Sequence, residues 1–212
     1  MTIPEGARRR YASSVREARA RRTRAHVVAT AGKLFAARGY AGTSMRQIAA
    51  EAGVSLETVT QTGRKPQLLL AAFRDGFAGD PDAMDLDALA GPAGPADLPS
   101  VVSNVAAGVR RSLPIWRAFT TAAAADAEVA AVRAELAVAR RAEIVHRLSA
   151  AGLAPEGGSA GRLADAIGLI TSHEAYDHLT TVCGWAHEEY VAWAAAAIPA
   201  QLTLGWSAGG RL

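Results

Sequence analysis

Apolar residues recur every three or four positions through the first part of the chain, which is the period of an amphipathic helix. The first predicted helix begins near Thr23 and ends at Gly39, because the residue that closes a helix in a left-handed conformation is most easily a glycine. Three further helices are predicted over about 45–52, from Ser55 to about 62, and from Pro66 to about 78. The first apolar stripe consists of Val27, Ala31, Leu34 and Phe35.

A segment rich in proline, glycine and aspartate over 79–99 interrupts this pattern, and we interpret it as an acidic linker or long loop. Helical patterning then returns, and Pro199 is expected to kink or end the last helix. The strand pattern of alternating Val, Ile and Thr bounded by turns is missing, so the predicted fold class is all-α. The later helices are predicted over 100–113, 114–125, 127–151, 162–171, 173–182 and from 186 onward.

Charge is divided unevenly between the two parts of the chain. Residues 1–78 hold 14 Lys and Arg against 5 Asp and Glu, a net +9, whereas residues 79–212 hold 9 against 15, a net −6. This asymmetry indicates a polyanion-binding end. Eight of the arginines lie in the first 24 residues, so a basic flexible tail is the simpler explanation. Residues 1–22 have no apolar period and are predicted to form a disordered basic arm.

The class of protein is narrowed further by what the sequence lacks. The single cysteine, Cys183, allows no internal disulfide and indicates a reducing compartment. The arginine-rich start is not followed by the apolar stretch of a signal peptide. The long uncharged run over 190–210 contains Pro199 and several glycines, which makes it unsuitable as a spanning helix. We therefore expect a cytoplasmic protein without membrane association.

Residues 45–59 have the spacing of a helix-turn-helix unit. The small side chain of Ala49 lets two helices approach closely, and Gly53 makes the turn between them. The space between the helices is filled by Ile48, Val54 and Val59. Such a unit places its second helix in the major groove of DNA. An ordinary helical hairpin inside a bundle is the alternative that the same pattern allows.

Residues 24–78 resemble the DNA-binding domain of the TetR family. The resemblance rests on Gly39-Tyr40, on the tract from Thr43 to Ala49, on Ala52-Gly53-Val54-Ser55, and on Lys65 before a leucine-rich helix. It implies an N-terminal three-helix helix-turn-helix domain, joined through a fourth helix to a helical C-terminal domain. The last part of the chain resembles actinobacterial members at Tyr176, Gly184-Trp185, Glu188-Glu189-Tyr190 and Trp193.

Membership in this family implies a homodimer that binds a palindromic operator and that a small molecule releases. The last two long helices would form the dimer interface as a four-helix bundle. Carried over by position, the phosphate-contacting start of the second helix is Thr43, Ser44 and Arg46. The exposed face of the recognition helix is Ser55, Leu56, Glu57, Thr60 and Gln61, and the backbone-gripping lysine is Lys65.

Gln61 is the best candidate for reading bases, because its amide can pair with adenine N6 and N7. Glu57 could accept from cytosine N4 or only favour the helix dipole. Thr60 and Thr62 stand where the family usually has aromatic residues, and the segment before Gly63 is one residue short. This departure suggests weakened packing and phosphate contact, for which the arginines of the arm can compensate.

The rest of the chain offers few candidates for catalysis or ligand binding. Gly205-Trp206-Ser207-Ala208-Gly209 has the form of a nucleophile elbow, but too few residues follow it to supply an acid and a histidine. His173 and His178 are five apart, so they diverge instead of sharing a metal; pairs of Glu174 with His178 or of His173 with Asp177 are expected instead. The residues that could line a ligand cavity, unless they belong to the core, are Trp116, Phe119, His146 and Trp185.

The sequence therefore predicts a ligand-responsive, TetR-like transcriptional regulator, a repressor by the family's usual mode, that is not an enzyme and needs no cofactor or metal. A related helical dimer that binds a ligand or partner and has lost sequence-specific DNA binding is the first alternative. A small helical enzyme that uses the C-terminal cavity is the second.

Overall fold

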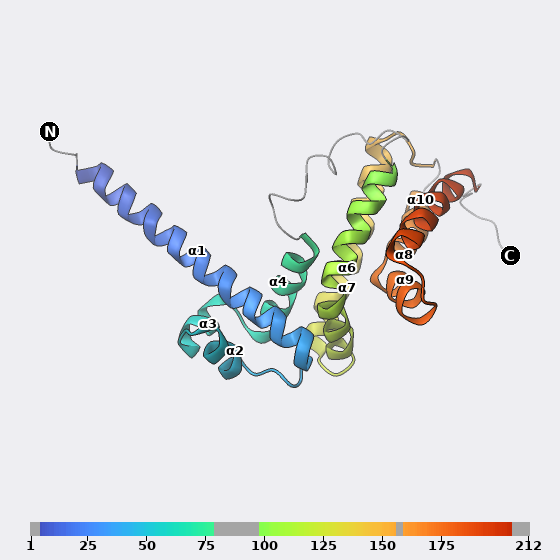
Figure 1. Cartoon of the computed structure of the whole chain (residues 1–212). Coiled ribbons are helices and arrows are strands. Elements are labelled where there is room, and N and C mark those ends of the chain that lie inside the picture. The colour runs from blue at the N-terminus through green and yellow to red at the C-terminus, as the bar shows by residue number, and fades with distance from the viewer. Residues whose placement is uncertain (1–4, 79–97, 156–158, 205–212) are drawn as a thin grey trace. The chain divides into compact units, whose positions relative to one another are not determined.

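The computed structural model describes residues 5–78, 98–155 and 159–204, and within these ranges all regular structure is helical (Figure 1). The predicted all-α fold class is confirmed. The chain divides into two compact units, the first ending at Asp75 and the second beginning at Gly76. The interpreted linker lies outside the described residues except for Leu98 and Pro99, which begin a helix. The predicted Gly205–Gly209 motif also lies outside them.

The helices of the first unit pack around a core of aliphatic and aromatic side chains. Its described helices are α1 (Glu5–Arg38), α2 (Met45–Ala52), α3 (Leu56–Thr62) and the greater part of α4 (Lys65–Ala78). The predicted stripe of the first helix is buried as expected. The core consists of Val27, Val28, Ala31, Leu34, Phe35, Ile48, Val59, Leu68, Leu69, Ala72 and Phe73.

α1 begins far upstream of the predicted start near Thr23. The prediction of a disordered arm over 1–22 is wrong for the described residues 5–22, which are helical and continuous with the rest of α1. The reason is intrinsic propensity: this segment is dominated by alanine and arginine, both strong helix formers, and has no glycine or proline between Gly6 and Gly32. Apolar periodicity could not reveal it, because the sequence has no apolar stripe there.

The turn between α2 and α3 has the predicted geometry. Gly53 has φ of +62°, in the left-handed region, and its N–H donates to carbonyl oxygens of the last turn of α2. The N–H of Val54 donates to Ala49 O at 3.1 Å, which completes the helix ending. Ile48, Ala49 and Val59 are buried between the helices. The turn therefore sets the direction in which α3 leaves α2.

The second unit consists of helices only, within its described residues. They are α6 (Leu98–Ala123), α7 (Ala127–Ala150), α8 (Ala160–Ile170), α9 (His173–Asp177), the π-helix η2 (His178–Val182) and α10 (His187–Thr203). α6 packs against α7, α9 and α10, and α8 packs against α7 and α10. The buried residues that join these helices are Val102, Ala106, Val109, Leu113, Leu148, Leu163, Ala164, Ile167, Tyr176, Tyr190, Ala194 and Ile198.

Two prolines lie inside helices and do not end them. Residues 100–113 and 114–125 were expected as separate helices, but Pro114 lies inside the single helix α6. Pro199 lies inside α10, which continues to Thr203. A proline removes one backbone hydrogen bond, and burial of apolar side chains on both sides of it can offset that loss. Val109, Leu113 and Phe119 provide such burial around Pro114.

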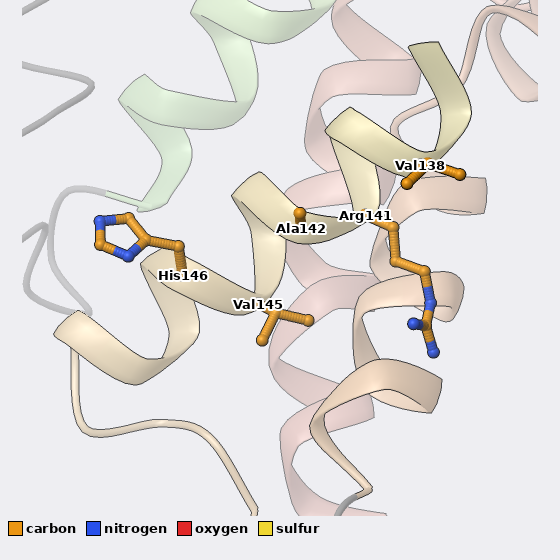
Figure 2. Close-up of a pocket in the computed structure, with 5 residues that line it drawn as sticks. All are labelled: Val138, Arg141, Ala142, Val145 and His146. Carbon is orange, nitrogen blue, oxygen red and sulfur yellow. The ribbon is translucent and has the colours of Figure 1, made fainter. Parts of the chain in front are cut away.

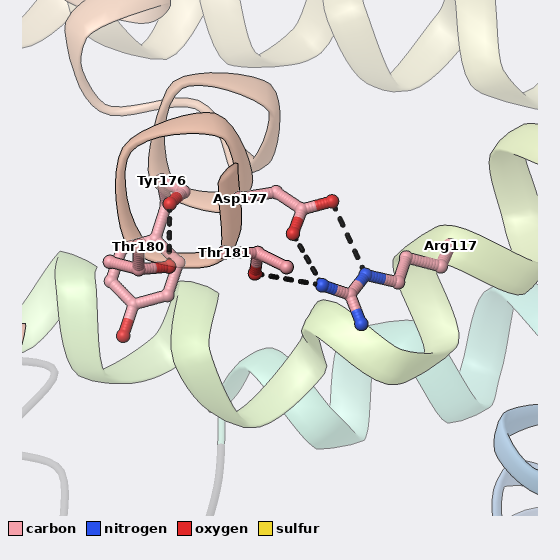
Figure 3. Close-up of polar contacts among 5 residues, drawn as sticks. All are labelled: Arg117, Tyr176, Asp177, Thr180 and Thr181. Carbon is pink, nitrogen blue, oxygen red and sulfur yellow. Dashed lines mark hydrogen bonds and ion pairs between the residues drawn. The ribbon is translucent and has the colours of Figure 1, made fainter. Parts of the chain in front are cut away.

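Polar side chains anchor the short helices of the second unit (Figure 3). The Arg117 guanidinium on α6 forms an ion pair with Asp177 and donates to Thr181 Oγ1 at 3.0 Å. The hydrogen bond from Arg117 holds the pKa of Asp177 below its ordinary value. The Thr180 hydroxyl donates to Tyr176 O at 2.7 Å within the same turn. These contacts fix α9 and η2 against α6.

Two side chains from other helices donate hydrogen bonds to carbonyl groups at the C-terminal end of α8. Arg140 Nη2 on α7 donates to Thr171 O at 2.9 Å and to Thr171 Oγ1 at 2.6 Å. The Tyr190 hydroxyl on α10 donates to Ile170 O at 2.8 Å. Carbonyls at a helix end have no partner in the helix, and a cation there also interacts favourably with the helix dipole.

Among the described residues, no helix has both the length and the apolar character needed to cross a membrane.

Replacing Gly53 by alanine is expected to destabilise the first unit by roughly 1–2 kcal/mol, the cost of a left-handed L-residue. A Cβ at Gly53 meets no other atom within 4 Å, so the loss would report backbone conformation alone. Urea unfolding followed by far-UV circular dichroism measures it. Gly53→Asn is the matched control, with a smaller loss because asparagine tolerates this conformation. Equal stability of Gly53→Ala and the wild type would contradict the left-handed turn.

Candidate nucleic-acid interface

The N-terminal end of α2 is an exposed, capped helix start. The Ser44 hydroxyl accepts from Gln47 N at 3.2 Å, and Gln47 Oε1 accepts from Ser44 N at 2.7 Å, which forms a capping box. Ser44 and Arg46 are both exposed. A helix start of this kind has backbone N–H groups and a positive dipole end that suit a phosphate.

Thr43 is not part of this surface, and its assignment as a phosphate contact is wrong for the side chain. It is 1% exposed, and its hydroxyl donates to Gly39 O at 2.9 Å, with Leu34 O at 3.2 Å. The residue joins the loop after α1 to the end of that helix. Its role is to position Ser44, since a buried hydroxyl that donates to a carbonyl cannot also donate to DNA.

α3 presents a row of exposed side chains. Ser55 caps the helix by accepting from Thr58 N at 3.1 Å, as predicted. Leu56 is 41% exposed, and Glu57, Thr60 and Gln61 are exposed too. Only Val59 of this helix is buried. The helix is therefore held by one apolar side chain and its caps, and the rest of its surface is open.

Hydrogen bonds within α3 hold the side chains that would read DNA. Gln61 Nε2 donates to Glu57 Oε1 at 3.2 Å, one turn apart. The Thr60 hydroxyl donates to Leu56 O at 2.9 Å, and the Thr62 hydroxyl donates to Thr58 O at 2.9 Å. The amide of Gln61 is therefore oriented by a carboxylate, and the two threonines bond to their own helix.

Lys65 lies at the start of α4 over the ring of Tyr40, with Nζ 4.0 Å from the ring centroid. Tyr40 in turn contacts Phe35, with ring centroids 5.8 Å apart. This cation–π contact orients the lysine while leaving it partly exposed. Tyr40 carries part of the family resemblance, but its contact with a residue 25 positions later was not visible in the sequence.

Two further residues of α1 that sequence reasoning missed bind the ends of the helix-turn-helix unit. Arg24 Nη1 donates to Thr62 O at the C-terminal end of α3, at 2.6 Å. His26 Nε2 lies 3.2 Å from Ala52 O at the end of α2. Both satisfy carbonyls that have no partner in their own helix. No local pattern marks either residue, because both contacts are long-range.

Aromatic side chains of the second unit have different surroundings. The Trp116 ring stacks on Phe119 and on His173, with centroids 5.9 and 4.7 Å apart. Phe119 is fully buried and belongs to the core. Trp185 packs edge-on against Trp193 with centroids 6.0 Å apart.

An open hollow lies on the outer face of α7 (Figure 2). Of the four predicted ligand residues, only His146 lines it. The other lining residues are Val138, Arg141, Ala142 and Val145. The structure therefore does not bring the four predicted residues together around this hollow.

The predicted surface pairs near His173 are wrong. His173 is 7% exposed, and its Nε2 lies 2.8 Å from Ser112 Oγ. Glu174 pairs with Arg133 at 3.3 Å, whereas His178 lies 3.5 Å from Cys183 Sγ. Packing against α6 turns His173 inward, which its spacing did not show. The described residues contain no group of three His, Cys, Asp or Glu side chains placed to hold a metal ion.

Residues 27–61 match the family of bacterial regulatory proteins, tetR family. Over this segment the first unit is similar to the TetR family. The match covers α2 and nearly all of α3, together with the part of α1 that packs against them. The helix-turn-helix unit predicted from spacing lies within the segment that is similar to this family.

Solved structures extend the likeness to the second unit. A protein assigned to the TetR family of transcriptional regulators from Mesorhizobium loti is 19% identical, with a TM-score of 0.66 over 88% of this chain and 98% of that chain. A protein from Pseudomonas aeruginosa that is assigned as a transcriptional regulator is 18% identical, with a TM-score of 0.67 over 86% of this chain and 91% of that chain. A transcriptional regulator from Rhodococcus sp. is 20% identical, with a TM-score of 0.60 over 84% and 95%. The fold of the described residues is thus similar to that of these solved regulators, one of which is assigned to the TetR family. The chain matches no curated protein significantly.

The stability of the chain is expected to fall as the pH falls below about 6.5, through His173. Burial lowers the pKa of His173 to about 3. Between about pH 6.5 and 3 the His173 side chain is therefore neutral in the folded chain, whereas in the unfolded chain it takes up a proton. The unfolded state therefore binds more protons between these values, and each pH unit costs about 1.4 kcal/mol. Urea unfolding at a series of pH values measures this slope.

His173→Gln should flatten the slope between about pH 6 and 4, whereas His178→Gln, at an exposed histidine, is the matched control and should keep it. If His173→Gln retained the full pH dependence, the buried neutral histidine would not be its source.

Proposed function

We propose that the chain is a ligand-responsive transcriptional repressor that binds a palindromic operator as a homodimer and is released by a small molecule. The observation that carries this proposal is the capped helix-turn-helix unit: Gly53 turns α3 away from α2, and α3 then presents an almost entirely exposed polar face. The unit also has an excess of basic residues, as a partner of DNA requires. Such a regulator acts in the cytoplasm, needs no cofactor and performs no catalysis.

Contacts with DNA would divide between position and sequence. The start of α2, with Ser44 and Arg46, would bind a phosphate, and Lys65 would bind the backbone beside it. α3 would enter the major groove with Ser55, Leu56, Glu57, Thr60 and Gln61 toward the bases. The hydrogen bond to Glu57 uses one N–H of the Gln61 amide, so the carbonyl oxygen and the second N–H could still form the two hydrogen bonds that adenine requires.

The dimer would form through the last long helices of the second unit. Leu169 on α8 is 66% exposed, an unusual state for a leucine in a helix whose other face is core. A second chain packed on this side, related by a two-fold axis, would cover Leu169 and give two helix-turn-helix units related by symmetry. Half-sites about one helical turn apart would then match the two heads, so that a palindrome is the expected operator.

The effector would bind in the second unit and change the spacing of the heads. Trp116 and Trp185 are half-buried and can contact a ligand, with fully buried Phe119 behind Trp116. His146, in the hollow of α7, is a separate candidate. A ligand that favours one spacing must lower DNA affinity by the same coupling free energy that DNA imposes on the ligand.

Selection of bound duplexes from a random-sequence library tests this proposal. The expected result is one enriched palindromic sequence, bound by two chains per duplex as determined by mass photometry. Enrichment of no sequence, or of a single half-site bound by one chain, would contradict it.

Gln61→Ala is expected to weaken binding to the selected duplex by roughly 10-fold to 100-fold, the usual value of one bidentate base contact, and to relax the preference at one base pair of each half-site. Fluorescence anisotropy with the four single-base variants of that position measures both effects. Glu51→Ala, at an exposed position of α2 outside the proposed contacts, is the control and should keep the wild-type base preference. A uniform loss over all four variants would assign Gln61 to the backbone instead of to a base.

A helical dimer that has lost specific DNA binding is the second candidate function. The specific observation in its favour is that Thr60 and Thr62 donate their hydroxyls to their own helix, where the family usually places aromatic side chains. The carboxylate of Glu57 on the exposed face adds repulsion toward phosphates.

Thr60→Tyr separates the two candidates. If α3 already binds DNA through its present side chains, the substitution should change affinity for the selected duplex by less than roughly tenfold in an anisotropy titration, because one added aromatic contact is worth about 1 kcal/mol. Thr58→Ser is the control for disturbance of the helix. A gain of several hundredfold would show that specific binding had been lost with the aromatic residue.

A further inference from the structure

The N-terminal part of α1 is a basic helix without an apolar stripe. Residues 1–24 hold eight arginines against two glutamates, and the helix is continuous from Glu5 to Arg38. Its described side chains from Arg16 to Arg22 are exposed or half-buried. The arginine positions do not follow the period of the helix, so they do not gather on one face. A membrane surface would require an apolar side, which this helix lacks.

Such a helix gains little from packing, and repulsion among its arginines opposes it. A short helix without tertiary contacts is only marginally stable in water. Neutralisation of its charges by a polyanion would remove the repulsion and stabilise the helical form. The sequence of this segment therefore suits a surface of regularly spaced negative charges, and duplex DNA is the one that the same unit is proposed to bind.

The attachment of this helix places it beside the proposed recognition helix. The hydrogen bond from Arg24 to Thr62 O joins it to the C-terminal end of α3, and His26 contacts the end of α2. From Val27 onward the helix contributes buried side chains to the core of the first unit. Arginine side chains contact phosphates more often than bases, and phosphate contacts fix position without carrying sequence information. The extension is therefore expected to contact the backbone beside the bases that α3 reads.

The length of the extension is sufficient to reach several phosphates. At 1.5 Å per residue, the stretch from Arg8 to Arg22 spans about 21 Å, which is about six base pairs along a duplex. We infer that the extension of α1 over residues 5–24 is a second DNA-contacting element that lies on the phosphate backbone beside the half-site read by α3. This inference rests on the proposed function and adds a partner surface to it.

The extension would act on affinity and not on sequence preference. Arginine contacts with phosphates release counterions, so each adds to the steepness of the salt dependence. Because these contacts carry no base information, their loss should weaken the selected duplex and an unrelated duplex alike. This property separates the extension from Gln61, whose loss should change the preferred sequence.

The test compares full-length wild type with the double variant Arg19→Gln/Arg22→Gln. Both arginines are exposed and lie one turn apart. The matched control is Arg110→Gln/Arg162→Gln, at two exposed arginines of the second unit. Anisotropy titrations across a salt series use the duplex selected from the random library, once with long flanks and once trimmed to the palindrome. Far-UV circular dichroism verifies that all three proteins are folded.

For the double variant, the slope of log K against log salt should become shallower by about 1.8, the value of two phosphate contacts, with roughly tenfold weaker binding near 0.15 M salt. The control should keep the wild-type slope. Trimming the flanks should weaken the wild type more than the double variant.

Equal slopes for the wild type and the double variant on the long duplex would overturn the inference while leaving the proposed function intact. A wild type that binds the selected and unrelated duplexes equally would overturn the proposed function and this inference with it. A decrease in slope for the double variant on duplex RNA of the same sequence, but not on duplex DNA, would assign the extension to RNA and overturn the DNA assignment.

Discussion

The exposed face of α3 depends on one constraint, which is the close approach of α2 and α3 at Gly53, a glycine in the left-handed conformation. Gly53 alone has the backbone freedom to end α2 and turn the chain within so few residues. Ile48 and Val59 then fill the space between the two helices with no exposed surface. Because α3 buries only one side chain, its orientation is set by this turn, by its cap at Ser55 and by the contact from Arg24 to its last carbonyl.

The second unit uses a different means of fixing short helices. Its long helices bury an apolar core, whereas α9 and η2 are too short to be held by packing alone. The ion pair of Arg117 with Asp177 and the buried contact of His173 with Ser112 attach them to α6. Such polar contacts have strict geometry, so a change in one of them would be felt by the neighbouring helices.

The helix-turn-helix unit was closely predictable because its signals are local. Glycine at a left-handed position, serine at two helix starts and small or branched residues between the helices each have a local cause. Local residue patterns are therefore sufficient to place the ends of α2 and the cap of α3. The helix over residues 5–22 was missed because propensity rather than an apolar face supports it. Pro114 was taken as the start of a separate helix and Pro199 as a kink or end of the last one, although both lie inside continuous helices.

Side-chain surroundings were less predictable than backbone structure. Thr43 matches the family position for a phosphate contact, but the loop after α1 turns its hydroxyl inward to Gly39 O. His173 was expected at the surface, yet packing against α6 buries it. The four candidate ligand residues are aromatic or basic residues whose proximity depends on how helices distant in sequence meet. Hydrophobic periodicity identifies which residues face a core, but not which of them leave room for a ligand.

The most direct test of the account is the ratio of specific to non-specific DNA binding. Fluorescence anisotropy would measure full-length protein on the DNA that flanks its own gene, with unrelated duplex as competitor. If α3 reads sequence, binding should survive an excess of competitor, with a preference of about a thousandfold or more, as for other sequence-specific regulators. Binding that unrelated duplex displaces equally well would contradict the claim that α3 reads sequence.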